Sequence, residues 1–464
     1  MRAIAITFTL ICCLLMFHVK REEKLVLLII GMMTLVEVQV PFVPFHKANM
    51  LLPVCFLLSE WHALKTHYHA VLRTPYLRRP LKIVIFSTLI CAITTPYFNF
   101  GGVVQAELIF KYFVIAYAFC ATKNEDSLKS VLRASFYCLL VLTFFGVLNY
   151  LTMHAEFVNA VTVGRTSSIY EGVSLGDVGM ESDRFRVKSM FRSPFDYGFV
   201  CAAILLLHIH GFFKGYESKR TFQIAVGCCL FGVILCGCRT VWIASLISVS
   251  IYFLWGFPLS RTSVAGLLIL YCSLISYYSV PEVSEKIDSV TDIFSDNPTV
   301  SGSSLELRMI QFTTVMIHVH PHEIFGQGKG YYGKYLFDSG EADRDLYGIE
   351  SVIFSYILER GFFGLILWFS FYVLIFIYFK KHRQRYRRLT GLGVSILMLY
   401  VLYSIGTGEL GSVYPTMLLL GMTMKMIESK ERRLKLKAIL RRMTRRRKLT
   451  RRQQLIVILK AISR

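Results

Sequence analysis

Long apolar runs recur along the chain, separated by shorter polar segments. Most runs last about 16–25 residues and lack a polar stripe at helical spacing, which is the length an α-helix needs to cross a hydrocarbon core of about 30 Å. The pattern therefore predicts an all-α fold, a polytopic transmembrane helix bundle of about 12–13 spans with a partly helical external loop. The predicted spans cover residues 3–18, 25–40, 48–60, 81–98, 103–121, 129–152, 196–213, 222–238, 240–256, 263–280, 349–379, 390–409 and 411–427.

Lysine and arginine cluster in a subset of the short connections. With thirteen spans, these connections all lie on one side of the membrane, together with the carboxyl-terminal tail, and the positive-inside rule makes that side cytoplasmic. The basic connections are residues 19–24, 61–80, 214–220 and 380–388. The amino terminus and the two longest connections, 153–195 and 281–348, are then expected outside.

The second long connection is too long to lack structure. Ser303 or Ser304 can cap a helix that ends at or just before His320, because Pro321 follows. A spacing of four places one set of side chains on one face of this helix, which we expect to pack against the membrane domain. That set is Arg308, Phe312, Met316 and His320.

Composition and charge narrow the class of protein. Hydrophobic residues make up 54% of the 464 residues, above the roughly 45–50% of soluble domains. The net charge is +22, and residues 425–464 hold sixteen Lys or Arg against two Glu. We parse the chain as a transmembrane domain (1–427, including external loops 153–195 and 281–348) and a basic cytoplasmic tail (428–464). After a multi-span domain, such a tail favours contact with anionic lipid over nucleic acid.

Several residue patterns argue against a cofactor. All twelve cysteines lie inside predicted spans, so no disulfide framework is implied. His318, His320 and His322 are spaced by two, which does not suit a metal site on a helix. The glycines of the segment 326–330 follow no strand and precede no Lys-Ser/Thr pair, so a nucleotide loop is excluded. We expect them to act as a hinge or to permit close backbone approach to a ligand.

Arginines outside the basic connections are candidates for substrate binding. Arg239 lies at the outer junction of two spans, where an arginine either faces a polar cavity or anion or snorkels to the interface. Arg308 lies on the external helix, and Arg186 and Arg192 flank the start of a span. Two or three such guanidinium groups in one external cavity would suit a diphosphate, because each binds phosphate oxygens in a bidentate way.

A carboxylate completes the candidate set. Glu350 lies where the external connection meets the next span, and it either stabilises the helix dipole or acts as a general base toward a sugar hydroxyl. His318, His320 and His322 are rivals for the base.

Four ordered motifs resemble the bacterial O-antigen polymerase and O-antigen ligase superfamily of membrane glycosyltransferases. They are Arg186 through Phe191-Arg192-Ser193-Pro194, Cys238-Arg239-Thr240, Arg308 followed by a helix, Pro321 and Gly326-Gln327-Gly328, and Glu350-Ser351 through Gly361-Phe362-Phe363-Gly364. The resemblance covers roughly residues 184–370. Ligases usually carry a His-Asn pair where this chain has Glu350-Ser351, and this difference favours a polymerase.

The resemblance implies an enzyme that needs no metal or nucleotide. It would act on undecaprenyl-diphosphate-linked saccharides at the outer face of the bacterial inner membrane. Arg239, Arg308 and Glu350 would be catalytic, with Arg186, Arg192, His320 and His322 binding substrate. A chain-length regulator and a flippase are the expected protein partners, and the lipid bilayer surrounds the protein. No nucleic acid is expected as a partner.

Two other functions stay open at this stage, besides a non-catalytic role as a partner in assembly. One is an O-antigen ligase, which transfers the glycan to a different acceptor. The other is a transporter or flippase of the lipid-linked saccharide, although transporters often show paired halves and midplane charges, whereas here no halves repeat and the polar residues gather at the outer face.

Overall fold

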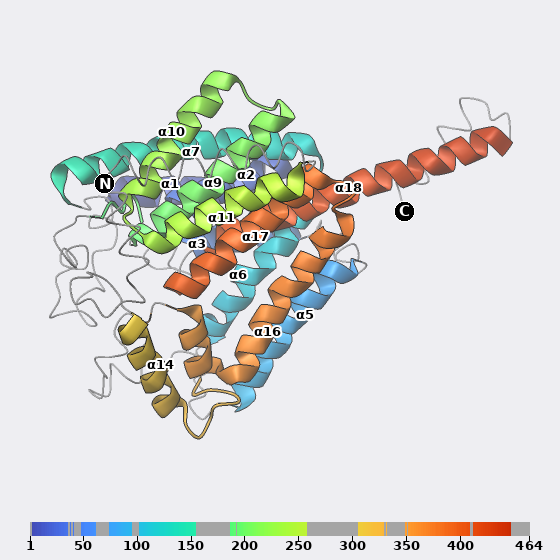
Figure 1. Cartoon of the computed structure of the whole chain (residues 1–464). Coiled ribbons are helices and arrows are strands. Elements are labelled where there is room, and N and C mark those ends of the chain that lie inside the picture. The colour runs from blue at the N-terminus through green and yellow to red at the C-terminus, as the bar shows by residue number, and fades with distance from the viewer. Residues whose placement is uncertain are drawn as a thin grey trace.

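The fold is built from helices (Figure 1). The computed structural model describes residues 2–35, 38, 40, 48–61, 74–94, 102–154, 186–191, 193–257, 305–328, 331, 349, 351–408 and 412–446, and within these ranges every regular element is helical. The helices are α1 (Arg2–His18), α2 (Arg21–Thr34), α3 (Ala48–Ser59), α5 (Pro75–Thr94), α6 (Gly102–Ala121), α7 (Glu125–Thr152), α9 (Pro194–Lys214), α10 (Lys219–Leu235), α11 (Arg239–Gly256), α14 (Leu305–Val319), α16 (Val352–His382), α17 (Arg387–Thr407) and α18 (Val413–Arg446).

The helix lengths and compositions are those of a polytopic membrane protein. In the described part, the five helices α7, α9, α11, α16 and α17 are long and apolar enough to cross a bilayer, and α1 is a shorter apolar helix. Every predicted span except 263–280 coincides with a described helix, and 263–280 lies outside the described residues. The prediction of an all-α transmembrane bundle is therefore confirmed.

Helix α9 is the central helix of the bundle, and its ends follow from local sequence. Ser193 accepts a hydrogen bond from the Phe195 N–H (3.2 Å), Pro194 occupies the first turn, and Gly215 ends the helix in the left-handed region (φ 69°). Its residues are apolar around the whole circumference and nearly all buried, because α7, α10, α11 and α17 surround it.

Glycines allow neighbouring helices to approach closely. Gly421 of α18 faces the Ile115 carbonyl of α6, and Gly391 of α17 faces the backbone of Gly256 in α11, so that a Cβ at either glycine would overlap with the partner or press against it. In a bilayer, where lipid tails are as apolar as the helices, such close packing is a main source of association.

Helix α16 consists of two pieces joined at Gly361, whose φ of 65° and ψ of −175° are not helical. The predicted single span 349–379 is therefore wrong in this detail. Its first piece packs on α14, with Phe312 and Phe354 rings 6.0 Å apart, and its second piece packs on α5 (Figure 1).

The loop after α14 closes the break in α16. The N–H groups of Gln327 and Gly328 donate to the carbonyls of Leu358 (2.9 Å) and Glu359 (3.1 Å). In return, the N–H groups of Phe362 and Phe363 donate to the Glu323 (2.9 Å) and Ile324 (3.0 Å) carbonyls. Four backbone groups at the break thus find hydrogen-bond partners in this loop, as the low-dielectric surroundings require.

Gly326 serves this contact between the loop and α16. A Cβ on Gly326 would overlap with the backbone of residues 359–361, and a Cβ on Gly361 would overlap with the Ile324 carbonyl. The predicted close backbone approach is real at Gly326, but the partner is the break in α16 rather than a ligand.

Helix α14 ends within a residue of the predicted position. Its buried face differs from the predicted one: Gln311, Val315 and Val319 are buried, whereas Phe312 and His320 are exposed. The buried stripe follows the partner surface around Ile357 and Leu358, which the spacing of four alone does not specify. Arg308 lies at the edge of this stripe and is half-buried.

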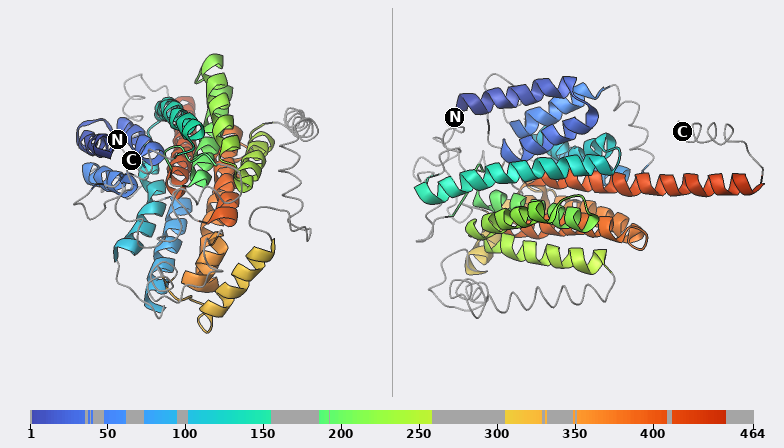
Figure 2. Two further views of the ribbon diagram at one scale, coloured as in Figure 1. Left: turned by 90° about the vertical axis from the view of Figure 1, so that its left-hand side faces the viewer. Right: turned by 90° about the horizontal axis from the view of Figure 1, so that it is seen from above.

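Helix α18 runs without interruption from the bundle into the basic tail, across the predicted domain boundary at 427/428. Val413 to Ile427 pack in the bundle, and the side chains of Arg432 to Lys435 are exposed. Its far end projects away from the body, on the side opposite α14 (Figures 1 and 2).

Candidate functional site

A short segment that precedes α9 lies against the turn between α10 and α11. The Val187 N–H donates to the Leu235 carbonyl (3.0 Å), which places Arg186 beside that turn. The stem of Arg186 covers Gly237, so closely that a Cβ there would lie 3.1 Å from Arg186 Cγ. Gly237 has φ 64°, a conformation glycine adopts without strain. Arg186 and Arg239 are thereby brought to the same turn from positions about fifty residues apart in the sequence.

Arg239 is the first residue of α11. The residue before it, Cys238, makes no side-chain hydrogen bond to the first turn of the helix. The amino end of a helix carries a partial positive charge and N–H groups that bind anions. A half-buried arginine at such an end, with a second arginine at the preceding turn, forms a strongly electropositive corner.

The carboxyl-terminal end of α17 brings a third element to this corner. Thr240 packs onto Gly406 of α17, at which a Cβ would overlap with the threonine side chain. Gly408 follows at the end of α17 and lies against the carbonyl of Ile349. Ile349 is two residues before Ser351, the residue that caps α16. The end of α17 therefore connects the start of α11 with the start of α16.

Arg308 is aligned with the start of α16 by the packing of α14. Helix α14 with its following loop runs in the same direction as the first piece of α16, because Phe312 faces Phe354 and Glu323 contacts Phe362 further along both segments. Arg308 lies one turn before Phe312, about 6 Å along the helix axis, so it is level with the first residues of α16. Figure 1 shows α14 on the same side of the bundle as the starts of α11 and α16 and the end of α17.

Two predicted binding residues lie elsewhere on the loop. His320 is exposed and pairs with Glu323 through Nδ1 at 2.5 Å. The backbone N–H of Glu323 and the His320 side chain both hydrogen-bond to the Glu323 carboxylate, and they hold its pKa below the usual range. His322 is half-buried and follows the carboxyl-terminal end of α14, whereas Arg308 is near the start of that helix. The structure therefore does not bring either histidine to the arginine corner. Glu350 and Arg192 lie outside the described residues.

Two buried charged residues were not selected from the sequence. Asp196, in the first turn of α9, is 6% exposed and accepts a hydrogen bond from Tyr403 Oη of α17 (3.0 Å). Arg360, next to the break in α16, is 6% exposed and stacks on the Tyr356 ring at 5.1 Å. A charged residue inside a predicted span was the available signal for both.

Asp196 and Tyr403 lie near the electropositive corner. Tyr403 is one turn from Thr407 at the carboxyl-terminal end of α17, and Asp196 follows the segment that carries Arg186. Among the described residues, no group of three or more His, Cys, Asp and Glu side chains is arranged to hold a metal ion. The positive charge of this corner is supplied by arginine and by a helix end.

Replacing Arg186 with alanine is expected to raise the KM for an anionic lipid-linked substrate about tenfold, with a smaller change in kcat. The reason is that a half-buried charge-assisted contact contributes about 1.5–3 kcal/mol to binding. Steady-state kinetics of the purified variant would measure the change. Gly237→Ala is the companion variant, because it displaces the Arg186 stem without removing its charge; an unchanged KM in both variants would contradict a binding role.

Fold and site together define a multi-pass helical membrane protein with an arginine-rich corner at one end of its bundle. The O-antigen ligase family matches residues 224–369, a range that includes Arg239, Arg308 and Glu350 but not Arg186. The resemblance to the O-antigen polymerase and ligase superfamily is thereby confirmed for this region. No curated protein matches the chain. The match supports a glycosyltransferase-like activity of the polymerase or ligase type, on lipid-linked saccharide in a membrane.

Proposed function

We propose that the protein is a polymerase that joins undecaprenyl-diphosphate-linked oligosaccharide repeat units into a surface polysaccharide, at the outer face of a bacterial inner membrane. The observation that carries the proposal is the convergence of Arg186, Arg239 and the starts of α11 and α16 at one end of the bundle. A diphosphate is the anion that such a set of guanidinium groups and a helix amino terminus would bind.

In the proposed reaction, a hydroxyl of the acceptor sugar attacks the anomeric carbon of the donor chain. A new glycosidic bond forms, the bond from that carbon to the diphosphate oxygen breaks, and the carrier diphosphate leaves with the electron pair. Glu350 takes the proton of the attacking hydroxyl. Arg239 and Arg308 hold the donor diphosphate and stabilise the charge that builds on it, without a metal ion. Arg186 orients donor or acceptor sugars.

A ligase is the second candidate, because the matching family is described as O-antigen ligase. The two reactions share the donor half of the site and differ in the acceptor. The Glu350-Ser351 pair, in the place where the resemblance leads us to expect His-Asn for a ligase, favours a polymerase.

The test is product formation by the purified protein in lipid nanodiscs, supplied with lipid-linked repeat units from its own host. A polymerase is expected to give a ladder of longer chains on the carrier lipid, and the Glu350→Gln variant at least 100-fold less. Glu359→Gln is the matched control, because Glu359 is a carboxylate nine positions further along the chain, inside α16 and next to the break. A product seen only after a second acceptor is added would indicate a ligase; no product with either acceptor would refute the proposal.

A further inference from the structure

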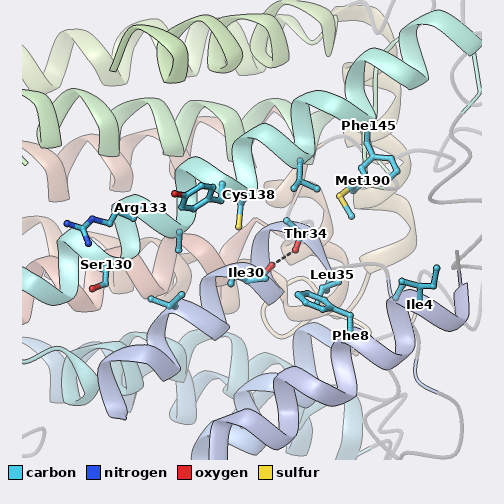
Figure 3. A pocket seen from close by; sticks show the side chains of 15 residues that line it. Ile4, Phe8, Ile30, Thr34, Leu35, Ser130, Arg133, Cys138, Phe145 and Met190 are labelled. Atoms are coloured by element: carbon cyan, nitrogen blue, oxygen red, sulfur yellow. Dashed lines mark hydrogen bonds between the residues drawn. The ribbon is translucent and has the colours of Figure 1, made fainter. Parts of the chain in front are cut away.

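An apolar groove lies along α7 (Figure 3). It has a volume of about 770 Å³, and α1, α2 and α7 form its walls. Its lining is almost entirely apolar and includes Phe8, Ile30, Leu35, Tyr137, Val141 and Phe145. Tyr137 is 67% exposed and Val141 42% exposed, so the groove opens on the surface of the bundle rather than inside it.

The groove is long compared with the thickness of a bilayer. Ser130 and Arg133 lie at one end, and Phe145 and Met190 at the other (Figure 3). Ser130 and Phe145 are separated by about 22 Å along the helix axis, compared with a hydrocarbon core of about 30 Å. A phospholipid tail extends only to the midplane of the bilayer, about 15 Å. A groove of this length therefore suits one chain that passes through both leaflets.

The end of the groove near Met190 is connected to the arginine corner. Met190 belongs to the segment that begins with Arg186, and α7 holds this segment by two hydrogen bonds. The Lys188 N–H donates to Asn149 Oδ1 (2.7 Å), and Ser189 Oγ donates to the Leu142 carbonyl (2.6 Å). One fixed stretch of five residues thus has an arginine at the anionic corner and a methionine in the apolar groove.

We infer that this groove holds the polyprenyl chain of the lipid-linked substrate. The inference rests on the proposed function, since it concerns the same substrate molecule. The diphosphate lies at the arginine corner, held by Arg239 and Arg308 beside Arg186, and the isoprenoid chain passes Met190 and continues between α2 and α7 toward Arg133. Methionine is a suitable lining residue at the entrance, because its flexible thioether adapts to an irregular branched chain. The groove then contributes to affinity for the carrier and takes no part in the sugar chemistry.

The test compares two substrates that share one sugar diphosphate, one on a long polyprenyl chain and one on a short, water-soluble prenyl chain. The Val141→Trp variant fills the groove, and we expect its KM for the long substrate to rise about tenfold while its KM for the short substrate stays unchanged. Val147→Trp is the matched control, because Val147 is on the same helix, is similarly exposed at 37%, and does not line the groove. We expect the control to behave as the unmodified protein with both substrates.

The possible results separate the groove from the proposed function. If the unmodified protein elongates both substrates and Val141→Trp changes neither KM, or changes both equally, the groove does not hold the chain. If the unmodified protein elongates neither, the proposed function fails, and binding is then decided without catalysis by a photoreactive polyprenyl phosphate. The inference is supported if the probe labels the α7 segment around Tyr137, and if excess polyprenyl phosphate prevents this labelling while phosphatidylglycerol does not. Equal competition by phosphatidylglycerol overturns it.

Discussion

Replacing Arg239 with alanine is expected to lower polymer formation by about 100- to 1000-fold, at an unchanged amount of protein in the membrane. That range is the usual effect of removing one preorganised group that stabilises charge in a transition state. The proposed mechanism gives Arg239 this role, and Arg239 is the first residue of α11, near the Arg186 stem and the carboxyl-terminal end of α17. Chain length on a gel, with immunoblotting for protein level, is the measurement in cells.

Two further variants make the Arg239 test specific. Arg239→Lys keeps the charge but loses the bidentate geometry, so we expect it to retain intermediate activity. Arg220→Ala is the matched control, because Arg220 is in the first turn of α10, at a helix start as well, but is exposed and belongs to a predicted cytoplasmic connection. Polymer of normal length and amount in Arg239→Ala would remove Arg239 from the donor site.

Replacing Gly361 with alanine is expected to destabilise the packing of α14 and its following loop on α16 by about 3 kcal/mol or more. Its φ of 65° and ψ of −175° lie in a region that only glycine occupies without cost, where other residues pay on the order of 1–3 kcal/mol. The added Cβ would also overlap with the Ile324 carbonyl, which is one of the four backbone groups that close the break in α16. The loss of these hydrogen bonds adds to the strain.

Limited proteolysis and thermal unfolding in nanodiscs would measure the effect of Gly361→Ala. We expect earlier cleavage after α14 and a lower Tm, together with lower activity, since α14 carries Arg308. Gly227→Ala is the control, because Gly227 is in α10 and a Cβ there meets open space. That variant is expected to be neutral or slightly stabilised, as alanine is favoured over glycine in a helix by about 0.5–1 kcal/mol. Equal behaviour of the two variants would contradict the role assigned to the break.

The helices themselves follow from local sequence. The apolar runs predicted their positions, and the ends of α9 and α14 were set by signals nearby in the chain: Ser193 with Pro194 at one start, and Pro321 at one end. The position of Arg239 at the start of a helix was likewise predictable, because span boundaries and a small-residue turn determine it.

The tertiary features were not predictable in the same way. The break at Gly361 is supported by hydrogen bonds from residues 323–328, and apolar runs carry no information about which backbone groups will pair across such a distance. The same holds for the buried face of α14, which is set by the surface of α16, and for the hydrogen bond between Tyr403 and Asp196, 207 positions apart. Arg186 was selected as a candidate, but its packing on Gly237 depends on a backbone conformation (φ 64°) that only the folded turn defines.

The continuous helix α18 has a consequence for the basic tail. From Glu428, where it leaves the bundle, to Arg446 the helix extends about 27 Å, several times the roughly 8 Å over which salt screens surface charge. The start of the tail is therefore a rigid continuation of the bundle rather than a loose segment that folds back onto it (Figure 1), and the backbone of its last turns lies beyond the electrostatic reach of charges on the bundle.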